Sequence, residues 1–325
     1  MIPKIINYIL SGIGGSVCLS TLLYYLYNSS RSYKLSQRRR CFKYSSEKVV
    51  IIGASSGIGR ELALIYAQRG ASIILVARRK ELLDELVLEC KQIAHTASLD
   101  IQVVSFPCDI TSYKKLSQLS KLVDDKFQVI DTLILNAGAL SVLKFADLIL
   151  ERTPTLPLAE RLSSVQDILS INYTSFVHIT AHLLSNLELS TAGNIVVVSS
   201  AAGVVGTPTR SLYSASKHAL HGFYNSLRME LEAAASPVKV VIVCPGSVDT
   251  QLRLSSVDGS KVDIRAVAGV KSGKLSPQSV AERIIQASDN SEELVFLPST
   301  YRHTVWLAYF FPSIISKLAR KKYGL

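Results

Sequence analysis

The fold is decided by the stretch KVVIIGASSGIGRELALIYAQRGASIILVARRK, residues 48–80. Apolar runs at 48–53 and 72–77 flank a glycine-rich turn and an amphipathic segment over 58–69. Neither apolar run alternates with polar residues, so both faces of each strand must be buried, which is typical of a parallel sheet covered by helices. The stretch therefore predicts a strand, a tight turn, a helix and a second strand parallel to the first.

The same alternation continues to residue 297. It predicts a single α/β domain with a Rossmann-type, doubly wound parallel sheet of about seven strands. Further strands are expected at 101–106, 129–135, 194–199, 238–243 and 293–297. The helices between them are expected at 79–95, 111–127, 163–189, 211–235 and 276–288. The predicted organisation is an N-terminal membrane anchor with a basic flank over 1–43, this domain over 44–300, and an apolar and basic tail over 301–325.

The turn after the first strand is a candidate cofactor site. Its glycines permit a tight turn and let backbone N–H groups approach a pyrophosphate at the start of the next helix. They are spaced GxxxGxG, unlike the commoner dinucleotide fingerprint GxGxxG. The residues predicted to bind there are Gly53, Ser55, Ser56, Gly57, Ile58 and Gly59.

A second motif, Tyr213-Ser-Ala-Ser-Lys217, follows Ser200 by thirteen residues and lies on the helix expected at 211–235. Residues four apart share a helix face, so the ammonium of Lys217 lies beside the phenol of Tyr213. The unperturbed pKa of a phenol, about 10, is too high for acid–base chemistry near pH 7. The charge of Lys217 favours the phenolate and therefore lowers the pKa of Tyr213. Ser200, at the end of the fifth strand, can donate a hydrogen bond to a substrate oxygen. The motif predicts proton transfer by Tyr213.

The glycine spacing and this serine, tyrosine and lysine set resemble the short-chain dehydrogenase/reductase family over about residues 47–298. The run YSASKHALHGFYNSLRMELE, from residue 213, resembles its membrane-anchored branch, which contains 11β-hydroxysteroid dehydrogenase and the dehydrogenase/reductase member 7 proteins. The resemblance implies a nicotinamide oxidoreductase with the tetrad Asn172, Ser200, Tyr213 and Lys217. In such a tetrad Asn172 holds a water that links Lys217 to solvent.

The resemblance also implies cofactor contacts at the ends of later strands. NAD enzymes of this design carry an acid after the second strand, which binds the ribose 2′-hydroxyl. Ala77 stands there and Arg78 follows, which favours the 2′-phosphate of NADP(H). Arg79 could assist or could simply begin the next helix, and Ser56 replaces the family's basic residue in the turn. The other implied contacts are Asp109, Asn136, Ala137, Gly138, Tyr213, Lys217, Pro245, Gly246, Val248 and Thr250.

Positive charge is concentrated at the two ends of the chain. The net charge is +11, residues 1–43 carry seven basic groups and no acid, and residues 313–325 carry four and no acid. Nucleic-acid-binding proteins carry such charge on the folded domain, so the expected partner is a membrane and not a nucleic acid.

The N-terminal segment over 5–27 has no charged side chain and is long enough to span a bilayer as a helix. A helix buried in the protein is the alternative. The excess of basic residues after the span places the body in the cytosol. We expect a single-pass protein of the endoplasmic reticulum membrane whose catalytic domain faces the cytosol.

The tail carries Trp306, Tyr309, Phe310 and Phe311 before its basic end, which predicts a segment lying on the bilayer or packed against the core. A cavity mouth resting on a membrane suits a lipophilic carbonyl or alcohol substrate, such as a steroid, a retinoid or a keto-lipid. Reduction is the expected direction, because most of the cytosolic NADP pool is present as NADPH.

Two other functions fit the same sequence. One is a 3-ketosphinganine-type reductase, and the other is a non-catalytic, nucleotide-binding membrane adaptor, which would need no proton donor. The family resemblance implies a homodimer through the helices over 163–189 and 211–235. The five cysteines are scattered and form no CxxC pair, so no metal site is predicted.

Overall fold

The computed structural model describes residues 44–142, 144–146, 157–252, 256–257 and 273–323. The segment predicted to span a membrane, 5–27, lies outside these ranges. Within them, no helix combines the length and the apolar character needed to cross a bilayer.

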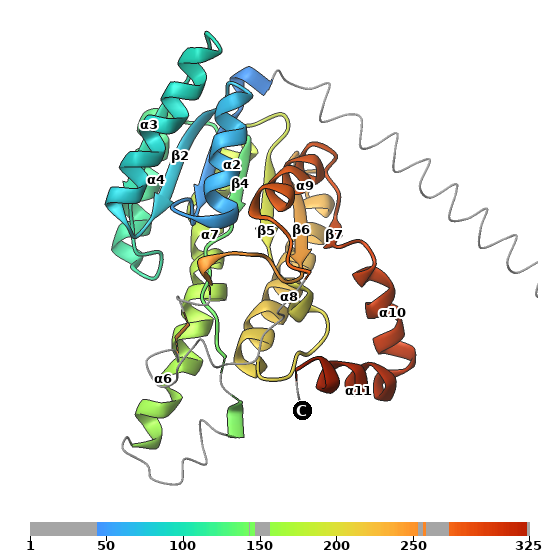
Figure 1. Cartoon of the computed structure of the whole chain (residues 1–325). Coiled ribbons are helices and arrows are strands. Elements are labelled where there is room, and N and C mark those ends of the chain that lie inside the picture. The colour runs from blue at the N-terminus through green and yellow to red at the C-terminus, as the bar shows by residue number, and fades with distance from the viewer. Residues whose placement is uncertain (1–43, 143, 147–156, 253–255, 258–272, 324–325) are drawn as a thin grey trace, which may run out of the picture.

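All seven predicted strands form, and they build one parallel sheet in the order β3-β2-β1-β4-β5-β6-β7 (Figure 1). The strands are β1 Lys48–Ile52, β2 Ser72–Ala77, β3 Val103–Pro107, β4 Thr132–Leu135, β5 Asn194–Val198, β6 Lys239–Pro245 and β7 Leu294–Leu297. The order reverses between β1 and β4, because β1 is flanked by β2 on one side and by β4 on the other. Ligands of open α/β sheets bind at such a switch point, beyond the carboxyl ends of the strands.

Helices cover both faces of the sheet. The principal helices are α2 Gly57–Gln68, α3 Lys80–Thr96, α4 Tyr113–Lys126, α6 Leu158–Leu169, α7 Ser175–Glu188, α8 Ser211–Ala233, α9 Pro277–Asp289, α10 Tyr301–Phe310 and α11 Pro312–Lys322. Residues of α2, α3 and α9 form one buried cluster with Val49 and Ile51 of β1, and residues of α4, α7 and α8 form another with Val50 and Ile52. Both faces of β1 are therefore buried, as its unbroken apolar run predicts.

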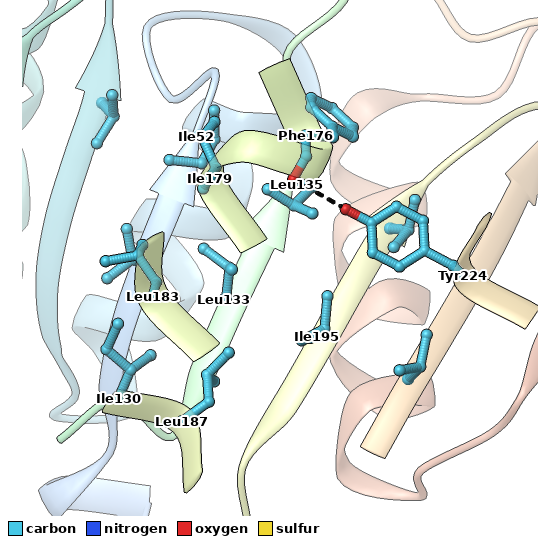
Figure 2. Close-up of a cluster of buried hydrophobic side chains, with 14 of the residues drawn as sticks. Ile52, Ile130, Leu133, Leu135, Phe176, Ile179, Leu183, Leu187, Ile195 and Tyr224 are labelled. Carbon is cyan, nitrogen blue, oxygen red and sulfur yellow. Dashed lines mark hydrogen bonds between the residues drawn. The ribbon is translucent and has the colours of Figure 1, made fainter. Parts of the chain in front are cut away.

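The contact between α7 and the sheet shows this packing in detail (Figure 2). Ile179, Leu183 and Leu187 of α7 lie along Leu133 and Leu135 of β4, and all five side chains are fully buried. The hydroxyl of Tyr224, on α8, donates a hydrogen bond of 3.1 Å to the carbonyl oxygen of Phe176. This layer holds α7 and α8 against the sheet; α8 carries Tyr213 and Lys217, and the turn before α7 carries Asn172.

The long helix predicted around 163–189 forms, but it begins earlier, at Leu158, and contains a π-helical turn that periodicity did not predict. It consists of α6, a π-helical turn η2 over Ser170–Thr174, and α7. Asn172 lies in the wide turn and is fully buried. Such turns inside α-helices are rare and occur frequently at functional sites.

Candidate active site

The carboxyl ends of the strands surround a cavity of about 1270 Å³. The glycine turn, the end of β2, the loops after β3, β4, β5 and β6, and the start of α8 all contribute to its wall. The predicted site residues in this wall are Gly53, Ser55, Ser56, Gly57, Ile58, Arg78, Asp109, Asn136, Ala137, Gly138, Ser200, Tyr213, Lys217, Pro245, Gly246, Val248 and Thr250. Gly59 and Asn172 do not line the cavity; they lie behind the residues that do.

The glycine turn requires glycine for two different reasons. Gly53 has a φ of +88° and Gly57 a φ of +55°, which are conformations that residues with a Cβ rarely adopt. At Gly59 the constraint is space, since a Cβ there would lie 2.0 Å from the carbonyl oxygen of Gly53. The side-chain amide of Asn136 donates a hydrogen bond of 3.0 Å to that same oxygen. The end of β4 therefore fixes the turn that begins α2.

A basic side chain lies against the glycine turn. It is that of Arg79, not that of Arg78, which was predicted to bind the 2′-phosphate. One guanidinium nitrogen of Arg79, Nη2, lies 2.9 Å from Oγ of Ser55 and 2.7 Å from Oγ of Ser56. Arg78 lines the same part of the cavity and is exposed, whereas Ala77 is buried at the end of β2. The sequence analysis left the role of Arg79 open; the structure places it at the turn, beside the serine that replaces the family's basic residue.

Tyr213 and Lys217 lie one turn apart on α8, both buried at the cavity wall. Burial raises the pKa of Tyr213 to about 12, against the opposing effects of a hydrogen bond with Ser200 and the charge of Arg210. Burial also lowers the pKa of Lys217 to about 8. Nζ of Lys217 lies 5.9 Å from the centre of the Tyr213 ring and donates a hydrogen bond of 3.0 Å to the carbonyl oxygen of Val198. The site thus holds a cation at a fixed place beside a phenol.

Asn172 is joined to the loop after β4. Its Oδ1 accepts a hydrogen bond of 2.8 Å from the backbone N–H of Ala139, and its Nδ2 donates bonds of 3.0 Å to the carbonyl oxygen of Ala139 and to Oγ of Ser216. A Cβ at Gly138 would lie 3.3 Å from Oδ1 of Asn172 and 3.9 Å from Nζ of Lys217. The glycine therefore leaves room where these two side chains converge.

The loop after β6 and the C-terminal tail close one side of the cavity. A Cβ on Gly57 would lie 3.0 Å from Cγ2 of Thr250, so this loop reaches across to the glycine turn. Gly246 packs directly against the ring of Tyr301, the first residue of α10. Tyr323, at the other end of the tail, also lines the cavity.

Residues 47–260 match the model of the short chain dehydrogenase family. The chain belongs to the short-chain dehydrogenase/reductase family. This dehydrogenase is 32% identical to a "Dehydrogenase/reductase SDR family protein 7-like" from Dictyostelium discoideum, over 92% of this chain and 88% of the relative. It is 31% identical to an "11-beta-hydroxysteroid dehydrogenase A" from Sesamum indicum, over 85% of this chain and 75% of the relative.

Two solved structures show the same fold as this dehydrogenase. A short-chain dehydrogenase/reductase from Burkholderia phymatum in complex with NAD has a TM-score of 0.68 at 21% identity, covering 84% of this chain and 96% of its own. A short-chain dehydrogenase from Shigella flexneri in complex with NADP has a TM-score of 0.60 at 24% identity, covering 77% and 95%.

A histidine that was not among the predicted site residues lies directly behind the candidate active site. Nε2 of His221 is 3.0 Å from Oγ of Ser199 and 3.5 Å from Sγ of Cys244. Burial lowers the pKa of His221 to about 4, so the ring is neutral near pH 7. It therefore links α8 to the ends of β5 and β6. The one signal in the sequence is its spacing, four residues after Lys217 on the same helix face.

Proposed function

We propose that this chain is an NADP(H)-dependent oxidoreductase that interconverts a ketone and a secondary alcohol on a lipophilic substrate, acting as a reductase in the cell. The observation that carries the proposal is the single cavity that brings Ser200, Tyr213 and Lys217 to the glycine turn. A proton donor and a dinucleotide cradle in one cavity are what hydride transfer to a carbonyl requires.

The residues around the turn fit a dinucleotide. The start of α2 presents backbone N–H groups, and the space at Gly59 and Gly53 is too small for any Cβ, so the backbone is held in place for a pyrophosphate. Asp109, whose carboxylate accepts hydrogen bonds from Thr111, lines the region expected to hold the adenine. Pro245, Gly246, Val248 and Thr250 would contact the nicotinamide end. When bound, the nicotinamide supplies or accepts the hydride.

The charges near the ribose favour NADP(H) over NAD(H). The relatives of known structure are described with NAD in one case and NADP in the other, so the family alone leaves the choice open. In this chain Ala77 stands in place of an acid, and the guanidinium groups of Arg78 and Arg79 both line this part of the cavity. A guanidinium binds a phosphate through charge and paired N–H donors, and Arg79 is already anchored by Ser55 and Ser56.

Tyr213 would move the proton. During reduction its hydroxyl gives a proton to the substrate oxygen as negative charge develops there, and Ser200 orients that oxygen by a hydrogen bond. A phenol with a pKa of about 12 holds its proton firmly, so the reaction needs positive charge beside it. The ammonium of Lys217 provides this charge at its position 5.9 Å from the ring. Asn172 would support Lys217 through a water, as the family resemblance implies.

The substrate side of the cavity is apolar. Among the side chains that line it are Leu140, Val205, Leu252, Val257, Ile315 and Leu318. Several relatives carry hydroxysteroid dehydrogenase names, which describe lipophilic alcohols and ketones. Both observations support a steroid, a retinoid or a keto-lipid as the substrate class.

Two further parts of the proposal rest on the sequence. We propose that residues 5–27 anchor the protein in the endoplasmic reticulum membrane as a single span with the catalytic domain in the cytosol, because of their length and the basic residues that follow. We also propose a homodimer through α7 and α8, as the family resemblance implies.

The test uses the full chain in detergent, mixed with NADPH and a panel of lipophilic ketones, while nicotinamide absorbance is followed. We expect turnover of one ketone class, and loss of that turnover in Tyr213→Phe while the variant still binds NADPH. The matched control is Tyr113→Phe, an exposed tyrosine on α4, which should turn over normally. NADPH binding without turnover of any ketone would favour the non-catalytic adaptor, and full activity in Tyr213→Phe would contradict the proposed proton donor.

A further inference from the structure

A buried arginine stands at the start of the helix that carries the candidate proton donor. Arg210 is the N-cap residue of α8, three positions before Tyr213, and only 6% of it is exposed. It lines the active-site cavity, yet the proton transfer proposed above gives it no role. Burying a guanidinium is costly unless specific contacts compensate for the lost water, so a buried arginine in a cavity wall needs a physical reason.

One nitrogen of this guanidinium joins two segments of the chain. Nη1 of Arg210 donates a hydrogen bond of 3.2 Å to the carbonyl oxygen of Val142. It also lies 3.0 Å from the carbonyl oxygen and 3.2 Å from Oγ1 of Thr209. Val142 is buried in the loop after β4, whereas Thr209 comes directly before α8. Arg210 therefore fastens the start of α8 to the loop that carries Gly138 and Leu140 in the cavity wall.

The turn before α8 has a conformation that needs such support. Thr209 has a φ of +62°, a left-handed value that β-branched residues rarely adopt. Backbone strain of this kind persists only where the surrounding contacts enforce it, and it is frequent at functional sites. Because the carbonyl oxygen and Oγ1 of Thr209 both accept from Arg210, the guanidinium is one of the contacts that stabilise this turn.

The loop after β4 is held at two points. Asn172 pairs with the backbone of Ala139, and Arg210 donates to Val142 three residues later. Ala139 and Val142 belong to the same buried cluster as Tyr213. Tyr213 therefore packs on the loop that these two side chains fix.

The guanidinium also brings positive charge close to Tyr213. Burial raises the pKa of Tyr213 to about 12, while the hydrogen bond with Ser200 and the charge of Arg210 act in the opposite direction. Among the described residues, the other ionisable groups beside Tyr213 are Lys217 on the same helix, Cys244 at the end of β6 and Tyr323 after α11. Of this set, Arg210 and Lys217 are the basic side chains.

We propose, on the basis of the proton transfer proposed above for Tyr213, that Arg210 is a positioning residue for this step. It fixes Tyr213 through the start of α8 and the loop after β4, and it holds positive charge beside the phenol. This charge favours the phenolate, which is the form that takes up a proton when an alcohol is oxidised. Loss of the charge therefore moves the ionisation of Tyr213 to higher pH.

The pH dependence of the reaction tests the role of the charge. Ketone reduction and alcohol oxidation are measured against pH with the full chain in detergent and the substrate class that the ketone panel identifies. In Arg210→Met the pH midpoint should rise by about one pH unit in both directions of the reaction. Alcohol oxidation below the midpoint should then fall about tenfold, while the KM for NADPH changes less than about twofold. A purely structural loss would lower the rates without moving the midpoint.

Two further variants separate the charge from the packing. Arg210→Lys keeps the charge but loses the fork of donors, so the midpoint should return close to that of the unchanged protein. Arg228→Met is the matched control, because Arg228 lies on the same helix and donates to the carbonyl oxygens of Val240 and Glu293 but does not line the cavity. Its midpoint should not move. An unmoved midpoint in Arg210→Met, or an equal movement in Arg228→Met, would overturn the proposal.

Hydrogen exchange tests the fastening of the loop without any turnover. In the unliganded full chain, the backbone amides of residues 138–142 should exchange at least about fivefold faster in Arg210→Met than in the unchanged protein. Arg228→Met and Tyr213→Phe should leave this exchange unchanged. Faster exchange in a chain that turns over no ketone would count against the proposed reaction and still support the hold of Arg210 on the loop.

The lysine variant carries the same test if Arg210→Met does not fold. Without the guanidinium fork, Arg210→Lys should also exchange faster over residues 138–142, although its charge is kept. Exchange equal to that of the unchanged protein, in whichever of the two variants folds, would overturn the fastening whatever the rates.

Discussion

The side-chain amide of Asn172 pairs with both backbone polar groups of Ala139: Oδ1 accepts from the N–H at 2.8 Å, and Nδ2 donates to the carbonyl oxygen at 3.0 Å. The pairing joins the π-helical turn η2 to the loop after β4, which carries Gly138 and the cofactor wall. Because Asn172 satisfies both polar groups of the buried Ala139 backbone, it orders the loop after β4, which forms part of the candidate site.

Replacing Asn172 by alanine should destabilise the protein by about 2–4 kcal/mol, because it leaves a buried N–H and a buried carbonyl without partners. Denaturant unfolding of the full chain in detergent measures this change. Asn225→Ala, on the exposed side of α8, is the control and should change the free energy of unfolding by less than about 0.5 kcal/mol. Equal stability of the two variants would show that the pairing with Ala139 carries little of the fold's stability.

Replacing Gly59 by alanine should distort the glycine turn, because the new Cβ would lie 2.0 Å from the carbonyl oxygen of Gly53. We expect a loss of about 2 kcal/mol or more of unfolding free energy and a large loss of NADPH affinity. Gly222→Ala is the matched control, since nothing lies within 4 Å of its Cβ position on α8. That variant should gain about 0.5–1 kcal/mol from the helix preference of alanine. A Gly59→Ala protein that binds NADPH normally would contradict the account of the turn.

Replacing Arg79 by alanine should weaken NADPH binding by about 10–100-fold and leave NADH binding unchanged, since the guanidinium contributes a charge-assisted hydrogen bond to the 2′-phosphate only. Titration of both nucleotides measures the preference. Arg60→Ala is the control, because Arg60 is paired with Glu61 and Glu89 on the far side of the turn and does not line the cavity. Equal losses for NADPH and NADH would instead mean that Arg79 only supports the turn through Ser55 and Ser56.

Stability should fall in acid because of His221. Burial holds the pKa of this histidine at about 4 in the folded chain, below its ordinary value of 6.5. Between these two pH values the unfolded chain binds a proton at His221 that the folded chain does not. The contribution of His221 to the free energy of unfolding is therefore complete above pH 6.5 and is lost as the pH falls toward 4. The loss should amount to at most about 3 kcal/mol. Unfolding at pH 7 and at pH 4.5 should show a smaller difference for His221→Gln than for the unchanged protein; an equal difference would place the acid sensitivity elsewhere.

Local patterns in the sequence were sufficient for the sheet, and together with the family resemblance they predicted most of the candidate site. Strand β2 was predicted with its observed bounds, because an unbroken apolar run between a glycine and an arginine pair leaves a buried strand few alternatives. The glycine turn, Asp109, the Asn136 loop and Ser200 all follow predicted strands, and the carboxyl ends of parallel strands meet at one edge. Their convergence on one cavity could therefore be anticipated without coordinates.

Only the tertiary structure decided the contacts between residues that are distant along the chain. Arg79 lies over Ser55 and Ser56 because β1 and β2 are neighbours in register, and no local pattern distinguishes that place from an ordinary helix start. The π-helical turn places the side chain of Asn172 against Ala139, whereas periodicity alone predicted a regular helix through this position. The tail was recognisably apolar and basic, but its two sides, one lining the cavity and one exposed, became distinct only when α10 and α11 packed beside β7. Periodicity reports which side of an element avoids water, whereas the identity of the group it meets depends on the packing of the whole chain.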